Sequence, residues 1–149
     1  MNAAYSYAGT NRRYTIEIEG AGTGGNTITV ANVGGGRKDF ESYVSVKGIN
    51  QIPQILINDD TFTVAAGSVI LENLYLYRHD GGAGNPNFTN FIFKDCYIDF
   101  DTDVPTFSGC TFRGVCYVKS TAVVVWTSCK GGLVVTNDSG LSSTIQGLS

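Results

Sequence analysis

The chain of 149 residues carries a net charge of −3 and is long enough for one domain with a sizeable hydrophobic core. Its basic residues are scattered, apart from Arg12–Arg13 and Arg37–Lys38, so we expect no nucleic-acid partner. Apolar runs are far shorter than a bilayer-spanning helix, and the first residues lack the apolar segment of a secretory signal, so we expect no membrane partner.

Short β-strands are predicted along most of the sequence, beginning at residues 14–19. There "YTIEIE" alternates apolar and polar residues with a period of two, as a strand with one buried face does. No stretch shows helical spacing of apolar residues. Further apolar runs follow in order at 27–33, 43–49, 54–58, 61–65, 68–77, 91–100, 106–114, 115–119, 122–129 and 132–135.

A two-residue polar corner recurs between these runs. "FSGC" at 107–110 has an aromatic residue, two small polar residues and an apolar residue, and "FKDC" at 93–96 and "WTSC" at 126–129 repeat the pattern. Two-residue hairpin turns such as Asn-Gly are largely missing. A corner of this kind bends a strand without reversing it, so the chain is expected to wind as a β-solenoid whose coils pair in parallel.

The residues that close these corners are predicted to stack as one ladder in the core. Its members are Val33, Ile49, Leu74, Cys96, Cys110 and Cys129, at spacings of 16, 25, 22, 14 and 19 residues. Cysteine suits such a position because it is compact, apolar and commonly buried. The alternative is an ordinary antiparallel β-sandwich or jelly roll that contains unrelated buried cysteines.

The pattern resembles the single-stranded right-handed parallel β-helix family, which includes pectate-lyase-like enzymes and bacteriophage tailspike shafts. The resemblance covers about residues 26–138 and rests on the corners "NV", "GI", "NL", "DC", "GC" and "SC". It implies an all-β, right-handed parallel β-helix of about five to six coils. Residues 1–25 would form an N-terminal arm or cap, and residues 139–149 a C-terminal tail. A homotrimer is expected, because outward apolar strips can close a shared seam.

Few motifs suggest a reaction or a cofactor. "GAGTGG" at 20–25 matches a dinucleotide fingerprint but precedes a predicted strand where a helix is required, so we expect no cofactor. His79 and Asp80 are sequence neighbours and would point to opposite faces of a strand. Four cysteines without Cys-x-x-Cys spacing indicate reduced thiols rather than a zinc site.

Two groups of side chains are candidate binding residues. Asp99, Asp101 and Asp103 alternate and would face one side of an extended strand, where they could bind Ca²⁺ or act as paired acids in glycan cleavage. A solvated acidic strand face or loop is the favoured interpretation. Pectate-lyase-like enzymes use such carboxylates, but those enzymes also carry basic residues close to the acids. Tyr75 and Tyr77 would line an outer surface if Leu74 and Leu76 point inward, which suits a subunit interface or glycan stacking.

The resemblance and the absence of catalytic motifs together favour a structural role in a virus particle. We expect a non-enzymatic virion protein of a tailed bacteriophage, assembled in the host cytoplasm. A capsid decoration or cement protein, which binds the major capsid protein and itself, fits a short chain best. The alternative is a spike or tail-tip protein that binds a bacterial surface glycan.

Overall fold

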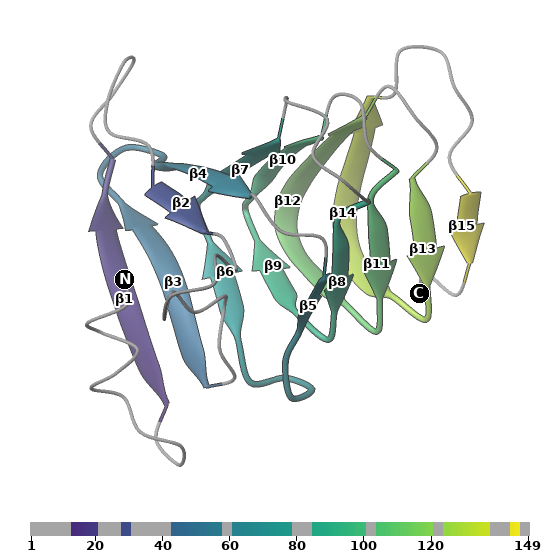
Figure 1. Ribbon diagram of the computed structural model, residues 1–149, viewed down its shortest axis with the longest axis horizontal. Helices are drawn as coiled ribbons and strands as arrows, with labels where there is room; N and C mark the ends of the chain where they lie inside the picture. Colours follow the sequence, from purple (N-terminus) through teal and green to yellow (C-terminus); the bar gives the residue numbers. More distant parts are fainter. Residues whose placement is uncertain are drawn as a thin grey trace.

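The structure is a computed structural model that describes residues 13–20, 28–30, 43–57, 61–78, 85–100, 104–120, 124–137 and 144–146. Every regular element within these ranges is a β-strand, and every pairing between them is parallel. The chain is therefore a parallel β-solenoid, as the polar corners predicted, and the antiparallel alternative is wrong (Figure 1).

The described strands form three stacks. The first holds β1 (Tyr14–Glu19), β3 (Val44–Ile49), β6 (Ile70–Glu72), β9 (Ile92–Lys94) and the first parts of β12 (Thr111–Ser120) and β14 (Lys130–Asn137). The second holds β2 (Ile28–Val30), β4 (Gln54–Ile57), β7 (Tyr75–Arg78), β10 (Tyr97–Phe100) and the second parts of β12 and β14. The third holds β5 (Thr61–Thr63), β8 (Asn87–Thr89), β11 (Thr106–Ser108), β13 (Val125–Thr127) and β15 (Thr144–Gln146).

Left-handed residues bend the chain between the first and second stacks. Asn73, Asp95 and Gly114 have φ angles of 54°, 51° and 65°, and each lies where a strand of the first stack gives way to the second. Asn, Asp and Gly tolerate this conformation best. The Asn73 side-chain amide also donates to the Gly48 carbonyl at 3.0 Å, so the polar corner residue ties its own coil to the preceding one.

A second corner joins the third stack to the first stack of the next coil. Here Asn90, Gly109 and Ser128 have φ angles of 69°, 61° and 52°. The Asn90 amide donates to the Val64 carbonyl at 3.1 Å, and the Gly109 N–H donates to the Thr127 carbonyl at 2.9 Å. This is the geometry expected of "FSGC": Phe107 and Cys110 are fully buried on either side of the turn.

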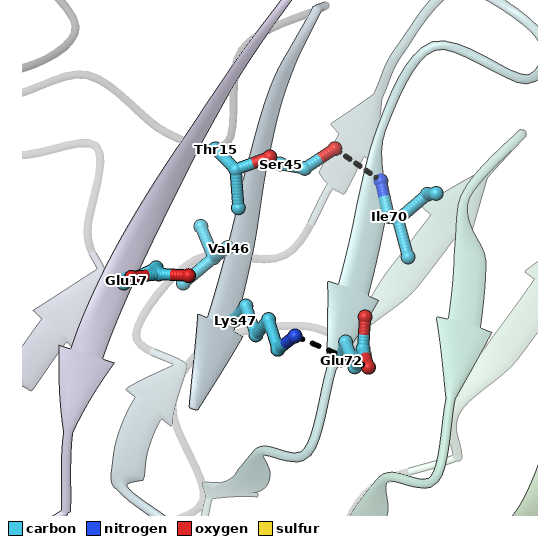
Figure 2. A pocket seen from close by; sticks show the side chains of 7 residues that line it. All are labelled: Thr15, Glu17, Ser45, Val46, Lys47, Ile70 and Glu72. Atoms are coloured by element: carbon cyan, nitrogen blue, oxygen red, sulfur yellow. Dashed lines mark hydrogen bonds and ion pairs between the residues drawn. The ribbon is translucent and has the colours of Figure 1, made fainter. Parts of the chain in front are cut away.

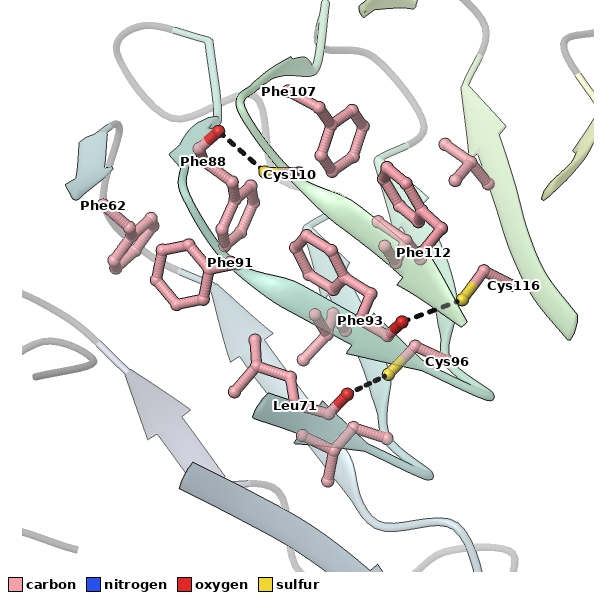
Figure 3. Close-up of a cluster of buried hydrophobic side chains, with 14 of the residues drawn as sticks. Phe62, Leu71, Phe88, Phe91, Phe93, Cys96, Phe107, Cys110, Phe112 and Cys116 are labelled. Carbon is pink, nitrogen blue, oxygen red and sulfur yellow. Dashed lines mark hydrogen bonds between the residues drawn. The ribbon is translucent and has the colours of Figure 1, made fainter. Parts of the chain in front are cut away.

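Aromatic rings fill the interior behind the third stack. Phe62, Phe88, Phe107 and Trp126 are in register on β5, β8, β11 and β13, with ring centroids 5.1, 5.9 and 4.9 Å apart in that order. Phe91, Phe93 and Phe112 pack edge-on against this column (Figure 3). Burying side chains of this size supplies the main stabilising term of the fold.

The predicted cysteine ladder is two ladders at two different corners. Cys96 precedes Tyr97 and Cys116 precedes Tyr117, which is paired with Tyr97, so Leu74, Cys96 and Cys116 stack where the first stack meets the second. Cys110 and Cys129 stack at the other corner, on Phe91. The 14-residue spacing from Cys96 to Cys110 spans only part of a coil, and the prediction of a single ladder was wrong.

The four thiols are free and buried, as the sequence indicated for reduced cysteines. Three of them donate to a main-chain carbonyl one coil earlier at 3.1–3.3 Å: Cys96 to Leu71, Cys110 to Phe88 and Cys129 to Phe107. Figure 3 shows the Leu71–Cys96 and Phe88–Cys110 contacts. Of the other predicted ladder members, Ile49 is half-buried and Val33 lies outside the described residues.

Two described strands lie in the segments predicted as arm and tail. β1 pairs with β3 along its whole length, and β15 pairs with β13. The division into residues 1–25, 26–138 and 139–149, with capping roles for the ends, stays a prediction.

Candidate functional site

The outer surface of the second stack carries a strip of tyrosines. Tyr75 on β7, Tyr97 on β10 and Tyr117 on β12 are in register, and Tyr77 lies two residues beyond Tyr75. Their neighbours Leu76, Ile98 and Val118 are fully buried in the core, because successive side chains of a strand point to opposite faces. Leu74 and Leu76 point inward, as predicted. The predicted outer position of Tyr75 and Tyr77 depended on this direction. We call these four residues the tyrosine face.

The rings of the tyrosine face contact one another. Tyr97 and Tyr117 stack with centroids 4.7 Å apart and planes 12° apart, and Tyr75 meets Tyr97 edge-on at 5.1 Å. Tyr75 and Tyr77 stack at 5.6 Å. Such contacts hold each ring in place, so the face is preorganised and loses little side-chain freedom when it binds a partner.

A buried carboxylate lies beneath the tyrosine rings. Asp99 is in register with Tyr77 and Lys119 and is only 4% exposed. Its Oδ2 accepts a hydrogen bond from the Tyr75 hydroxyl at 3.0 Å and lies 3.5 Å from the Lys119 ammonium. Asp99 is therefore part of the structure of the face and not a solvated acid.

The carboxylate changes the acidity of the phenols around it. Burial raises the pKa of Tyr75 well above its ordinary value, and the hydrogen bond and negative charge of Asp99 raise it further. The pKa of Tyr97 is also raised, by burial first and by Asp99 second. Both hydroxyls therefore keep their protons to a higher pH than an ordinary tyrosine, and the Tyr75 hydroxyl donates its proton to Asp99 in a hydrogen bond.

The other residues singled out from the sequence fall largely outside the described ranges. This is so for Asp101, Asp103, His79 and Asp80, and for most of "GAGTGG", whose Gly20 is described. β2 follows that motif where a dinucleotide fold has a helix. Within the described ranges no group of three or more His, Cys, Asp or Glu side chains lies close enough to hold a metal ion.

Tyr97 and Tyr117 are members of the face that the sequence reading missed. Each tyrosine follows directly after a corner residue: Tyr75 after Leu74, Tyr97 after Cys96 and Tyr117 after Cys116. The shared position would have aligned the three side chains without a structure. Because Cys116 was not recognised as a corner residue, this regularity was not visible.

The outer surface of the first stack is a ladder of charges. Glu17, Lys47, Glu72, Lys94 and Arg113 are in register across it. Lys94 donates to Glu72 at 2.9 Å, which raises the pKa of Lys94, and Lys47 lies 3.8 Å from the same carboxylate. Exposed pairs of this kind contribute little to stability, but the alternation of charge sign from Glu17 to Lys94, which ends at Arg113, favours the observed register.

A pocket of about 260 Å³ opens on this charged surface (Figure 2). Its lining includes Thr15 and Glu17 of β1, Ser45 and Lys47 of β3, and Ile70 of β6. The Ser45 hydroxyl accepts a hydrogen bond from the Ile70 N–H at 2.9 Å, in place of a main-chain partner. The pocket is small, and its Lys47 ammonium already lies 3.8 Å from the Glu72 carboxylate, so the pocket offers a weaker site than the tyrosine face.

Short side chains, all of them polar except Val125, cover the third stack. Thr63, Thr89, Ser108 and Thr127 form one register row, and Thr61, Asn87, Thr106 and Val125 form the other. Threonine and serine are well suited to exposed β-strand positions, so this surface is explained by the fold alone.

Comparison with known proteins returned no relatives: the chain matches no protein-family model, no curated protein and no solved structure. The described residues contain no helix long and apolar enough to cross a membrane.

Proposed function

We propose that this chain is a non-enzymatic structural protein of a tailed-bacteriophage particle, a capsid decoration protein that docks on the shell through the tyrosine face. The observation that carries the proposal is the in-register row of Tyr75, Tyr97 and Tyr117 on the outside of a rigid parallel sheet. Tyrosine is enriched at protein–protein interfaces, where it offers a large contact area and a polar tip.

The orientation of the rings favours a protein surface over a sugar as the partner. A sugar stacks on an exposed ring face, but Tyr97 and Tyr117 lie face to face with each other, and Tyr75 is stacked on Tyr77. Ring edges and hydroxyls are what such a column presents to a partner. Edges and hydroxyls can fill the small pockets of a protein surface and meet its main-chain carbonyls.

The finer features of the fold belong to the same proposal. We infer a right-handed winding, which parallel strand crossovers strongly prefer, and about five to six coils, a number supported by the depth of the three stacks. We infer a homotrimer in which the subunits share a seam, as symmetric oligomers do. The virion, after assembly in the host cytoplasm, is the proposed location, and the reduced thiols agree with synthesis there.

The absence of catalysis is also a proposal. Its support is that Asp99, the most deeply buried acid among the described residues, is only 4% exposed and is held by Tyr75 and Lys119. The pocket on the charged surface contains no His or Cys.

Particle association tests the proposal directly. Particles of the encoding phage should contain the chain, and particles that lack it should lose their shells at a lower temperature. A Tyr97→Ser/Tyr117→Ser protein should fail to rebind stripped shells while keeping its circular dichroism spectrum. The matched control, Thr63→Ala/Thr127→Ala on the third stack, should rebind normally. If purified wild-type particles of the encoding phage do not contain the chain, the proposal is refuted.

A second candidate, binding of a bacterial surface glycan, is favoured by one observation. Asp99 and Lys119 place a carboxylate and an ammonium among aromatic rings, which is a common composition for sugar sites. Host polysaccharide would then raise the melting temperature of the protein, and Lys119→Ala would abolish the shift. If no host glycan raises the melting temperature, docking on the shell remains the only proposed role.

A further inference from the structure

Cys110 and Cys129 are in-register neighbours on adjacent coils. The pairs Ser108–Thr127 and Thr111–Lys130 bracket them, and the Lys130 N–H donates to the Cys110 carbonyl at 2.8 Å. Both side chains point into the core and are fully buried. Each thiol donates to a main-chain carbonyl one coil earlier, Cys110 to Phe88 and Cys129 to Phe107, so the two side chains lie at equivalent positions of adjacent coils.

Their spacing is compatible with a covalent bond. Paired strands lie ~4.8 Å apart, and disulfide-bonded cysteines usually have Cα atoms about 4.4–6.8 Å apart. Cys96 and Cys116 are also in register, but Cys116 is paired with Val134 of the next coil, whereas Cys129 directly precedes β14, the last described strand of the first stack. Cys116 also contacts carbonyls of Phe93 and Arg113, both at 3.6 Å.

We propose that Cys110 and Cys129 form a disulfide that joins neighbouring coils when the protein meets a low-molecular-weight disulfide such as oxidised glutathione. The Cys129 thiolate attacks one sulfur of the reagent, which breaks its S–S bond and releases one reduced thiol. The Cys110 thiolate then attacks the Cys129 sulfur and expels the second. Two protein thiols give up two protons and two electrons, and one small disulfide becomes two thiols.

The order of attack follows from the position of the two thiols on adjacent coils. When Cys129 ionises, the Cys110 thiol can turn its proton from the Phe88 carbonyl to the Cys129 thiolate, which lowers the pKa of Cys129, while burial opposes ionisation. The interaction of its proton with Cys129 and its burial raise the pKa of Cys110. Because both residues are buried, the reagent reaches Cys129 only when β14 opens locally, so oxidation is expected to be slow.

The bond would close a loop from residue 110 to residue 129 and hold together the two coils nearest the C-terminal end of the described stacks. Such a loop restricts the unfolded chain and so favours the folded one. A particle made in a reducing cytoplasm would form this disulfide, and gain its stabilising effect, only after release from the cell. The chemistry is independent of the proposed function, since the isolated chain can be tested.

The experiment uses the full chain incubated with excess oxidised glutathione, then alkylated in denaturant and analysed by intact mass and peptic mapping. Two of the four thiols should resist alkylation, and one linked peptide should join Cys110 to Cys129. The melting temperature should rise, and dithiothreitol should reverse both changes. Cys96→Ala/Cys116→Ala should form the same bond, whereas Cys110→Ala and Cys129→Ala should not.

Three outcomes would overturn the proposal. All four thiols could stay reduced in the folded protein while the denatured chain is oxidised by the same reagent. The linked peptide could join Cys96 to Cys116 instead. The product could be a stable glutathione adduct, which would show that Cys110 cannot reach the Cys129 sulfur.

Discussion

The main-chain N–H of Val115 donates to Oδ1 of Asp95 at 3.0 Å, so the corner of one coil holds the corner of the next. β12 carries one extra residue at this point, a β-bulge between Phe112 and Val115, and Gly114 occupies it with a φ angle of 65°. The bulge redirects β12 from the first stack to the second without interrupting it. A single strand can therefore serve two faces of the solenoid.

Replacement of Gly114 by alanine should destabilise the protein strongly. An alanine Cβ would collide with the Asp95 carboxylate that the Val115 N–H binds, and a left-handed φ angle is itself unfavourable for alanine. Gly67 is the matched control, because its φ angle is 70° and nothing lies within 4 Å of the added Cβ. Urea unfolding should show a loss of ~1 kcal/mol for Gly67→Ala and ~3 kcal/mol for Gly114→Ala. Equal losses would mean that Asp95 moves aside at no cost.

The corners explain how far the sequence alone could predict the fold. A polar pair between two apolar residues identifies a bend, and the parallel solenoid follows from it. The pattern does not distinguish the two corners of a coil. Asp95–Cys96 and Gly109–Cys110 lie at different corners, but each consists of a left-handed residue followed by a small buried one. Only the strand pairing separates the two corners.

The site was harder to predict than the fold, for a similar reason. Tyr75 and Tyr77 could be placed outside from alternation within one strand, but their alignment with Tyr97 and Tyr117 depends on the register between coils. The burial of Asp99 could not be foreseen either, since rings from neighbouring strands surround its carboxylate. Alternation alone assigns an aspartate at an outward position to solvent.

Substitutions at Asn90 should follow a defined order of stability. Asn90 has a φ angle of 69°, and its amide donates to the Val64 carbonyl. Glycine keeps the backbone relaxed but loses the hydrogen bond, at a cost of ~1 kcal/mol. Alanine loses the bond and is also strained, at ~2 kcal/mol. The free energy of unfolding, measured by chemical denaturation, should be highest for the wild type, lower for Asn90→Gly and lowest for Asn90→Ala. A reversed order of the two variants would show that backbone strain is unimportant at this position.

Tyr75→Phe should cost more stability than Tyr97→Phe, although both remove one hydroxyl from the same face. The Tyr75 hydroxyl donates to the buried Asp99 carboxylate, and its loss removes a charge-assisted bond of roughly 1–2 kcal/mol. Tyr97 keeps its stacking on Tyr117 in the phenylalanine variant. Thermal and urea unfolding of both variants would measure the difference. A near-neutral Tyr75→Phe would mean that Lys119 alone satisfies Asp99.

Stability should fall as the pH rises above 9, and Cys96 should contribute to the slope. Burial raises the pKa of the Cys96 thiol to about 12 from an ordinary 9.0. Between these values the unfolded chain has lost the thiol proton and the folded chain has kept it, so the unfolded state binds fewer protons and the free energy of unfolding decreases with pH. The contribution is complete below pH 9 and is lost as the pH approaches 12.

Cys96→Ala isolates this effect, because the raised pKa values of Cys116 and Tyr75 remain in both proteins. The variant should be less stable than the wild type at pH 8, since it leaves a small cavity in the ladder. Urea unfolding measured from pH 8 to pH 11 should then show a shallower decline for Cys96→Ala, so that the two stability curves converge. Parallel curves would mean that the Cys96 thiol ionises as readily in the folded protein as in the unfolded chain, and that the ladder admits water.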